Sequence, residues 1–304
     1  EFLYSKPENM VTIAKQLMLK RTKNDVGLEL PELRTSFVPI EWRNSTELEL
    51  AEDIHSLLNF SGSSKSIAKN KMRNIDSETL CLLTRARQVC IYPPLLEKSI
   101  NKMIEEELIE DSDELRQAVR STSKVDTVVS TILNRSNNGR GKLVFCHYRG
   151  EIDAIKNDLS LMGLNVETFD GRTSIMDRER ILTDKCDVLI LQIKTGCEGL
   201  NLQHFSEIYF VSPHWNPSVE DQAIARCHRI GQKEEIDVFR FCASGEFRTL
   251  EQYSTEVQMA KRTIIEQADA EHRDATLEEQ LKREEQEQKK EEEREIKEAL
   301  HCIQ

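Results

Sequence analysis

The feature that most constrains the fold is an alternation of short apolar segments with amphipathic ones, which begins near Lys124. The clearest apolar segment is DVLILQ, residues 187–192. A run of this length and β-branched character is typical of a strand buried on both faces. We predict further strands at 142–146, 165–169, 207–211 and 236–241, and helices at 151–162, 175–184 and 217–230. Strands separated by helices predict an α/β fold, a parallel sheet with helices on both faces.

The segments on either side of this alternating region show helical patterns. Residues 1 to about 120 are predicted to be mostly helical, with a polar break at 61–65 (SGSSK) and a turn at Pro93-Pro94. From about residue 250 the sequence is helical again and increasingly charged. Sustained apolar heptads are missing there, so a solvated helix or frayed tail is favoured over a coiled coil.

Composition limits the possible partners and compartments. Residues 266–304 hold 14 acidic and 7 basic residues, a net −7 of the chain's −12, so the acidity does not exclude a nucleic-acid surface elsewhere. The eight cysteines form no CxxC pair, which disfavours both a zinc site and a disulfide framework. No apolar run suggests a membrane span, and the first residues, EFLYSKPENM, do not form a signal peptide. Because the chain lacks an initiator methionine, we expect a fragment of a longer protein.

The run WNPSVEDQAIARCHRIGQ, residues 215–232, carries the most specific chemistry. Gln222, Arg226 and Arg229 stand at i, i+4 and i+7, which places them on one stripe of the predicted helix. Guanidinium groups held on a rigid element suit phosphate recognition. A neighbouring apolar stripe is expected to pack on the sheet; it comprises Val219, Ala223, Cys227 and Ile230.

Two further runs place phosphate-binding residue types after strands. In DVLILQIKTGCEGLNL, the spacing of Gly196 and Gly199 allows backbone amides to approach a phosphate, although alone it is more typical of a plain tight turn. In ETFDGRTSIMDR, Arg172 and Thr173 suit a phosphodiester backbone, with a helix cap and a solvated arginine as the equal alternative. Parallel sheets bind ligands at the carboxyl ends of their strands, and we expect the motif loops there.

Taken together and in this order, these runs resemble the second RecA-like lobe of the Swi/Snf family of superfamily-two, helicase-like ATPases. KLVFCHY (142–148) is similar to the family's fourth motif, DVLILQIKTGCEGLNL to the fifth, and WNPSVEDQAIARCHRIGQ to the block that ends in the sixth. The segment VEDQAIARCHR is most similar to the corresponding segment in the branch of the family that contains helicase-like transcription factor. Gln192 departs from the pattern, because the family usually has serine at that position.

The resemblance implies a role for each matched residue. Arg226 and Arg229 would act as arginine fingers on the γ-phosphate, with Gln222 orienting the same network. On the nucleotide side of the cleft the matched residues are Gly196, Gly199 and Asn201. On the DNA side, Trp215 would lean against a strand, and phosphates would be held by Arg172, Thr173, Lys194 and Thr195.

The same resemblance implies a domain division and a set of partners. Residues 1–35 would be the tail of the first RecA-like lobe, 36–120 a helical protrusion, 121–250 the second lobe, and 251–304 a brace and charged helix. ATP and Mg²⁺ would be bound mainly by the first lobe, because neither a phosphate loop nor an Asp-Glu box occurs in this sequence. Partners would be double-stranded DNA, the first lobe, and chromatin or repair proteins, in the nucleus or, for a viral protein, the cytoplasm.

The function expected from these residues is that of the C-terminal half of a DNA-dependent ATPase, which moves along duplex DNA or remodels protein–DNA complexes. By itself the chain is expected to hydrolyse essentially no ATP. A strand-separating DNA or RNA helicase of the same superfamily is the nearest alternative, and the WNP turn and RIGQ ending favour the Swi/Snf side. The other alternative is a non-catalytic scaffold lobe. The retention of Gln222, Arg226 and Arg229 argues against it, because a scaffold needs none of them.

Overall fold

The structure, a computed structural model, describes residues 27–58, 77–196 and 200–267. The chain divides into two compact units, Leu28–Gln258 and a second that joins Glu1–Gly27 to Met259–Gln304. Of the second unit only residues 27 and 259–267 are described, and 259–267 are helical. The polar break predicted at 61–65 and most of the charged tail lie outside the described residues.

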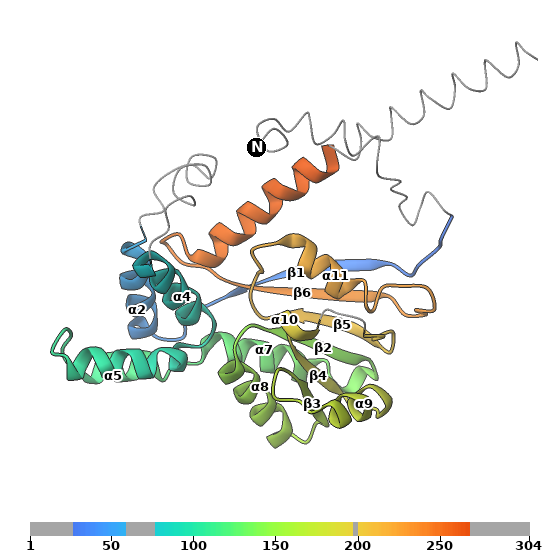
Figure 1. Ribbon diagram of the computed structural model, residues 1–304, viewed down its shortest axis with the longest axis horizontal. Helices are drawn as coiled ribbons and strands as arrows, with labels where there is room; N and C mark the ends of the chain where they lie inside the picture. The colour runs from blue at the N-terminus through green and yellow to red at the C-terminus, as the bar shows by residue number, and fades with distance from the viewer. Residues whose placement is uncertain (1–26, 59–76, 197–199, 268–304) are drawn as a thin grey trace, which may run out of the picture. The chain divides into compact units, whose positions relative to one another are not determined.

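A six-stranded sheet, parallel throughout, forms the centre of the larger unit (Figure 1). Its order is β1-β6-β5-β2-β4-β3. The strands are β1 Leu33–Ile40, β2 Gly141–Cys146, β3 Val166–Phe169, β4 Val188–Gln192, β5 Phe205–Phe210 and β6 Ile236–Ala243. The predicted α/β class is therefore confirmed, and β2 to β6 fall within two residues of the predicted strand starts and ends.

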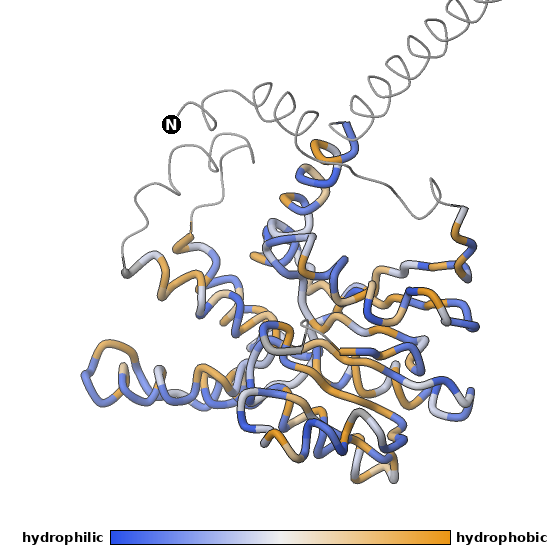
Figure 2. The backbone as a smooth tube through the Cα atoms, turned by 45° about the vertical axis from the view of Figure 1, so that its right-hand side comes forward, coloured by the Kyte–Doolittle hydropathy of each residue, from blue (hydrophilic) through white to orange (hydrophobic). Residues whose placement is uncertain are grey.

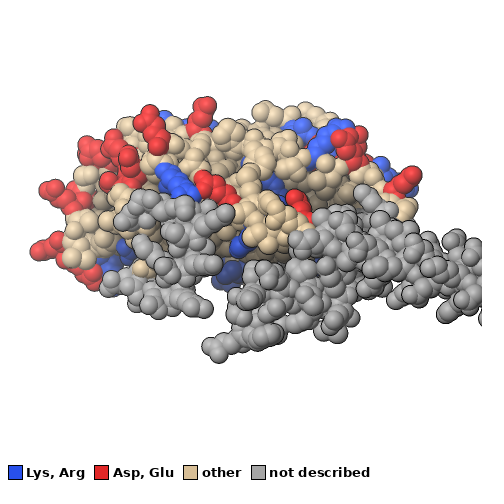
Figure 3. Space-filling model, turned by 90° about the horizontal axis from the view of Figure 1, so that it is seen from above, with Lys and Arg blue, Asp and Glu red and all other residues tan. Residues whose placement is uncertain are grey.

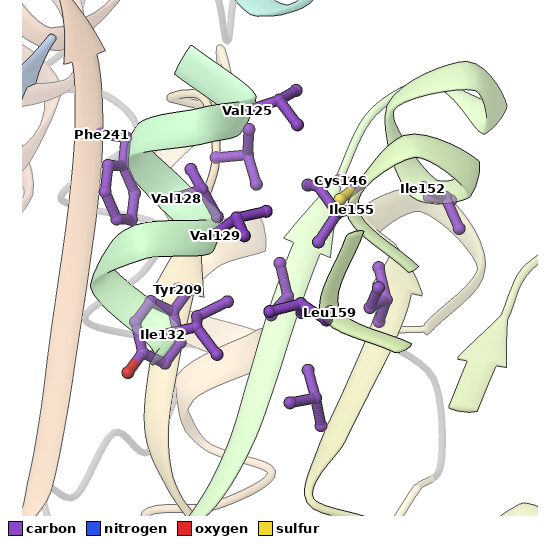
Figure 4. Close-up of a cluster of buried hydrophobic side chains, with 14 of the residues drawn as sticks. Val125, Val128, Val129, Ile132, Cys146, Ile152, Ile155, Leu159, Tyr209 and Phe241 are labelled. Carbon is purple, nitrogen blue, oxygen red and sulfur yellow. The ribbon is translucent and has the colours of Figure 1, made fainter. Parts of the chain in front are cut away.

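Side-chain alternation along the strands builds one apolar layer on each face of the sheet. One layer joins Cys146, Tyr209 and Phe241 to helices α7 (Ser123–Asn134) and α8 (Arg149–Leu161), as Figure 4 shows. The other layer joins the remaining strand positions to α9 (Ile175–Thr183), α10 (Ile193–Gly196) and α11 (Pro217–Ile224). Figure 2 shows the apolar strands as continuous orange segments between the more polar helices. Burial on both faces explains why these strands lack an alternating pattern.

Strand β1 was not anticipated, because residues 1 to about 120 were predicted to be mostly helical. Its sequence, LRTSFVPI, contains no apolar run, and Phe37 is 56% exposed. It is an edge strand, paired only with β6 along the whole register from Leu33 to Ile40. Edge strands bury little, so their sequences carry a weak signal. The domain boundary predicted after residue 35 falls inside this strand.

Helices between β1 and β2 form a separate apolar cluster beyond the carboxyl end of β1. They are α2 (Ser45–Ser56), α4 (Ser77–Ile91), η2 (Pro93–Leu96), α5 (Glu97–Glu105) and α6 (Asp113–Val119). The left-hand end of the face in Figure 3, over this helical part, is dominated by Asp and Glu side chains. A nucleic-acid surface is therefore expected elsewhere on the unit.

Neither a membrane span nor a metal cluster is found in the part of the chain that the structure describes. No helix there is long and apolar enough to cross a bilayer. No three His, Cys, Asp or Glu side chains there are grouped so as to hold a metal ion. Six described cysteines are present as free thiols, three of them buried.

Candidate functional site

The most specific motif begins as predicted but ends its helix early. Asn216 is the N-cap of α11 and accepts a hydrogen bond from the backbone N–H of Ser218, and Pro217 stands in the first turn. The helix stops at Ile224, six residues before the predicted end. Arg226 and Arg229 therefore lie on consecutive turns after the helix, and their placement on one helical stripe with Gln222 was wrong.

The helix ends because other groups take the carbonyls that would continue it. The carbonyl of Arg226 accepts the backbone N–H of Leu202 at 3.2 Å. The carbonyl of Cys227 accepts from the side-chain amide of Gln232 at 3.3 Å. Ala223 and Cys227 are buried as predicted, but Ile230 is 69% exposed, because the segment has left the helical path by then.

Gln232, the last residue of RIGQ, anchors the whole segment. Its Nε2 also donates to the carbonyls of Gln203 (2.8 Å) and Phe205 (3.3 Å), and its Oε1 accepts the backbone N–H groups of Lys233 and Glu234. The side chain is 9% exposed. Sequence reasoning treated this glutamine only as part of a family signature and missed its structural role.

These bonds bring four predicted nucleotide-side residues onto neighbouring segments. Asn201 is exposed and directly precedes Leu202, whose N–H is bonded to the Arg226 carbonyl. Gln222 and Arg229 are exposed, and Arg226 is partly exposed. We call Asn201, Gln222, Arg226 and Arg229 the finger group. Of the two predicted glycines, Gly196 ends α10 and Gly199 lies outside the described residues.

The predicted DNA-side residues Lys194, Thr195 and Trp215 follow the carboxyl ends of β4 and β5. Lys194 is exposed on α10, immediately after β4, and the backbone of Thr195 belongs to the same helix. Trp215 follows β5 and is partly buried, with its ring 6.3 Å from that of Tyr253 and 5.4 Å from the guanidinium of Arg87. The region after Gln192 was predicted to be a glycine loop, but its first four residues form helix α10.

Arg172 and Thr173, after β3, are both engaged within the protein. The guanidinium of Arg172 makes two hydrogen bonds to Asp153, at 2.7 and 2.9 Å, and binds Asp170 at 2.6 Å. The pKa of Arg172 is raised by the two carboxylates. The hydroxyl of Thr173 accepts the backbone N–H of Asp170 at 2.9 Å. In this state neither side chain is arranged primarily for a phosphate.

The predicted site is therefore divided. The sequence placed both motif loops at the carboxyl ends of the strands, and the loops do begin there. The chain then crosses the α10–α11 face, so the finger group lies beside residues 202–205, where β5 begins. Lys194 and Trp215 remain at the carboxyl ends of β4 and β5. The two groups therefore lie on different surfaces.

A network that sequence reasoning missed connects the carboxyl ends of β2, β4 and β5. The carbonyl of His147 accepts the side-chain amide of Gln192 at 3.1 Å, and its backbone N–H donates to Glu151 at 2.7 Å. The His147 ring stacks on the His214 ring, with 5.9 Å between the ring centroids and an angle of 7° between the ring planes. Gln192, a departure from the family pattern, thus links two strand ends.

Burial sets the protonation of this network. Glu151 is fully buried, and burial raises the pKa of its carboxyl to about 7. Burial, aided by the charge of Arg87, holds the pKa of His147 well below its ordinary value. A neutral imidazole at position 147 follows at physiological pH.

The finger group has the chemistry to meet an anionic polyphosphate but not its metal ion. It offers two guanidinium groups and two carboxamides, all hydrogen-bond donors. It contains no carboxylate, the side chain through which proteins usually hold Mg²⁺, and two of its four side chains are cationic. The finger group therefore fits the phosphates of ATP and does not fit Mg²⁺.

Comparison with known proteins agrees with this geometry. Residues 123–231 match the helicase conserved C-terminal domain. Over 169 residues, 53% of this chain, the sequence is 34% identical to DNA repair protein RAD5B of Arabidopsis thaliana. Over 164 residues, 50% of the chain, it is 35% identical to DNA repair protein RAD5 of Candida albicans. The matches span only 13% and 15% of those two proteins.

Solved structures share the fold. The C-terminal part of the Fun30 ATPase domain superimposes with a TM-score of 0.55 at 16% identity, over 76% of this chain and 90% of that one. The Hef helicase domain of Pyrococcus furiosus superimposes with a TM-score of 0.54 at 19% identity, over 79% of this chain and 63% of that one. Residues 123–231 therefore carry a helicase conserved C-terminal domain, and the chain is similar to the RAD5 DNA repair proteins, in agreement with the Swi/Snf resemblance of its motifs.

Proposed function

We propose that this chain is the C-terminal lobe of an ATPase that couples hydrolysis to movement along duplex DNA or to remodelling of protein–DNA complexes. One observation carries the proposal. The Leu202–Arg226 backbone bond joins the end of the glycine run to the arginine segment, which lies more than twenty positions further along the chain. The resemblance assigns both runs to the nucleotide side, and their contact in the fold supports that assignment.

Arg226 and Arg229 are the proposed arginine fingers. Bound ATP with its Mg²⁺ supplies the phosphoryl group and the metal's share of charge neutralisation. The two guanidinium groups stabilise the charge that develops on the phosphate oxygens in the transition state. Gln222, exposed on the first turns of α11, orients the same network, and Gly196, Gly199 and Asn201 border the nucleotide. A first lobe carries the phosphate loop and the metal ligands.

The carboxyl ends of the strands are the proposed DNA surface. Lys194 is an exposed cation there, and the partly exposed ring of Trp215 provides a stacking face. Thr195 completes this group. Arg172 and Thr173 join it only after Arg172 exchanges its bonds to Asp153 and Asp170 for a phosphate, because those carboxylates now take its donors. Contacts of this kind give affinity without sequence readout.

The partners and compartment follow from the DNA substrate. We propose double-stranded DNA, a first RecA-like lobe, and chromatin or repair proteins as partners. The compartment would be the nucleus, or the cytoplasm for a viral protein. The relatives' name, DNA repair protein, supports a role in repair.

The test uses a two-lobe polypeptide, in which this chain follows a first lobe that contains a phosphate loop. We expect ATP hydrolysis that duplex DNA stimulates, and a loss of about 10³-fold in kcat for Arg226→Ala. Arg180→Ala is the matched control, because Arg180 lies on α9 and pairs with Glu167 at 2.8 Å. Equal kcat in the Arg226 variant and the wild type would contradict the proposal.

A further inference from the structure

The turn that carries Trp215 is held by the buried carboxylate of Glu220. Glu220 lies in the first turn of α11 and is 0% exposed. Its Oε1 accepts the backbone N–H of His214 at 2.7 Å and the side-chain amide of Gln258 at 2.7 Å. Its Oε2 forms an ion pair with Arg240 of β6. One carboxylate thus joins the turn, α11, β6 and the helix that begins at residue 250.

The other contacts of the turn lead back to the same carboxylate. Gln258 also donates to the carbonyl of His214. Its side-chain amide therefore joins the backbone of His214 to the carboxylate of Glu220. Arg240 is 15% exposed and lies 5.0 Å over the ring of Phe210, the last residue of β5. The turn has little freedom of its own while these bonds hold.

A buried carboxylate with this set of donors is costly unless every partner stays in place. Removing one partner leaves a buried charge or donor unsatisfied, so the network has essentially one low-energy arrangement. A hydrophobic residue at position 220 would fill the space without fixing an orientation. The network therefore specifies geometry in addition to contributing stability.

The geometry it specifies is that of the proposed DNA surface. Trp215 directly follows His214, whose backbone N–H and carbonyl are both bound by the network. The His214 ring stacks on His147, which is bonded to Gln192 immediately before α10 and Lys194. The network thus reaches both proposed DNA contacts through His214.

We propose that Glu220 is a positioning residue for the DNA-coupled reaction: its carboxylate locks the 213–216 turn to Arg240 and Gln258 and thereby sets the orientation of Trp215. This inference rests on the proposed function for its effect on catalysis. It also gives Gln258, on the helix that begins at residue 250, a supporting role in the position of Trp215.

The first measurement uses this chain alone and needs no activity. The chain has two tryptophans, Trp42 and Trp215, so 5-fluorotryptophan labelling gives two ¹⁹F resonances, and Trp42→Phe assigns them. Trp42 donates to the carbonyl of Ser244 at 2.7 Å, outside the network, and serves as an internal reference. In Glu220→Gln we expect the Trp215 resonance to shift or broaden and the Trp42 resonance to stay. Glu179→Gln, on the exposed surface of α9, is the matched control and should move neither.

A second variant covers the case in which Glu220→Gln does not fold, since it leaves Arg240 without its buried charge partner. Gln258→Met removes only the bonds to the helix and keeps the Glu220–Arg240 pair. In the two-lobe polypeptide we expect it to raise the duplex concentration for half-maximal ATPase stimulation by about tenfold, with kcat at saturating duplex within about twofold of wild type.

The outcomes separate this inference from the proposed function. If both variants lower the melting temperature but leave the Trp215 resonance and the duplex requirement unchanged, Glu220 is merely structural and the inference is overturned. If the wild-type two-lobe polypeptide shows no DNA-stimulated hydrolysis, the proposed function fails, whereas the ¹⁹F result still decides whether Glu220 positions Trp215.

Discussion

Buried ionisable side chains define the behaviour of this chain at the scale of the residue. Glu151, Glu220 and the pair formed by Lys124 and Glu251 are all at most 2% exposed. Each carboxylate accepts at least one backbone N–H, which explains how charge is tolerated inside the unit. They surround the carboxyl ends of the strands, the region proposed to contact DNA.

Glu151 should make stability depend on pH. Burial raises its pKa from an ordinary value of 4.5 to about 7, so between these values the folded chain binds the proton more tightly than the unfolded chain. The free energy of unfolding should therefore fall as pH rises from about 4.5 to 7, by up to about 3 kcal/mol for this group alone. Glu151→Gln should remove this dependence while still accepting the His147 N–H.

The measurement is urea unfolding of both proteins at intervals from pH 5 to pH 8. The wild type should lose stability relative to Glu151→Gln as pH rises. A constant difference across that range would show that the Glu151 carboxyl titrates normally in the folded chain.

The ion pair between Lys124 and Glu251 should be costly to break from one side only. Both side chains are 2% exposed, and Glu251 also accepts the backbone N–H of Ala243 at 2.6 Å. Lys124→Met leaves a buried carboxylate without its cation and should cost about 3–5 kcal/mol in urea unfolding. The double variant Lys124→Met, Glu251→Gln should recover most of that loss. If the double variant is as unstable as Lys124→Met alone, the loss of stability does not come from the unpaired buried carboxylate.

At the scale of the element, the sequence predicted the strands that are buried on both faces. It did not predict the features that depend on tertiary hydrogen bonds. Strands β2 to β6 were predicted because each lies in a short segment rich in apolar residues. Edge strand β1 was missed because it exposes Phe37 and carries no such run. The end of α11 was misplaced because its 3.6-residue pattern continues to Ile230, whereas the carbonyls of Arg226 and Cys227 are taken by Leu202 and Gln232. No local pattern encodes those partners.

Gln232 should control the conformation of the arginine segment. Gln232→Ala removes hydrogen bonds to three carbonyls and two N–H groups and should cost about 2 kcal/mol in the free energy of unfolding. It should also speed hydrogen exchange at the Leu202 amide, whose bond to Arg226 the segment maintains. Gln222→Ala, exposed on α11, is the matched control and should stay within about 0.5 kcal/mol. Equal stability of the two variants would refute the anchoring role.

At the scale of the whole molecule, the domain places the proposed nucleotide residues and the proposed DNA contacts on two separate surfaces. The finger group lies beside the start of β5, and the proposed DNA contacts lie at the ends of β4 and β5. The resemblance already divided these residues into a nucleotide side and a DNA side. Their positions at opposite ends of the strands were not evident, because they depend on the path from Gln192 to Phe205 across the α10–α11 face. The segment that crosses this face joins the two proposed surfaces, and we propose it as the route for coupling between nucleotide and DNA.

The most direct test of this account is a titration of DNA-stimulated ATP hydrolysis by the two-lobe polypeptide, with Arg229→Ala and Lys194→Ala measured side by side. The account predicts that Arg229→Ala lowers kcat by about 10³-fold at saturating duplex without changing the duplex concentration for half-maximal stimulation. Lys194→Ala should raise that concentration by about threefold to tenfold and leave kcat near wild type. Loss of the same kinetic parameter in both variants, or an unchanged kcat in Arg229→Ala, would contradict the assignment of separate nucleotide and DNA surfaces to this lobe.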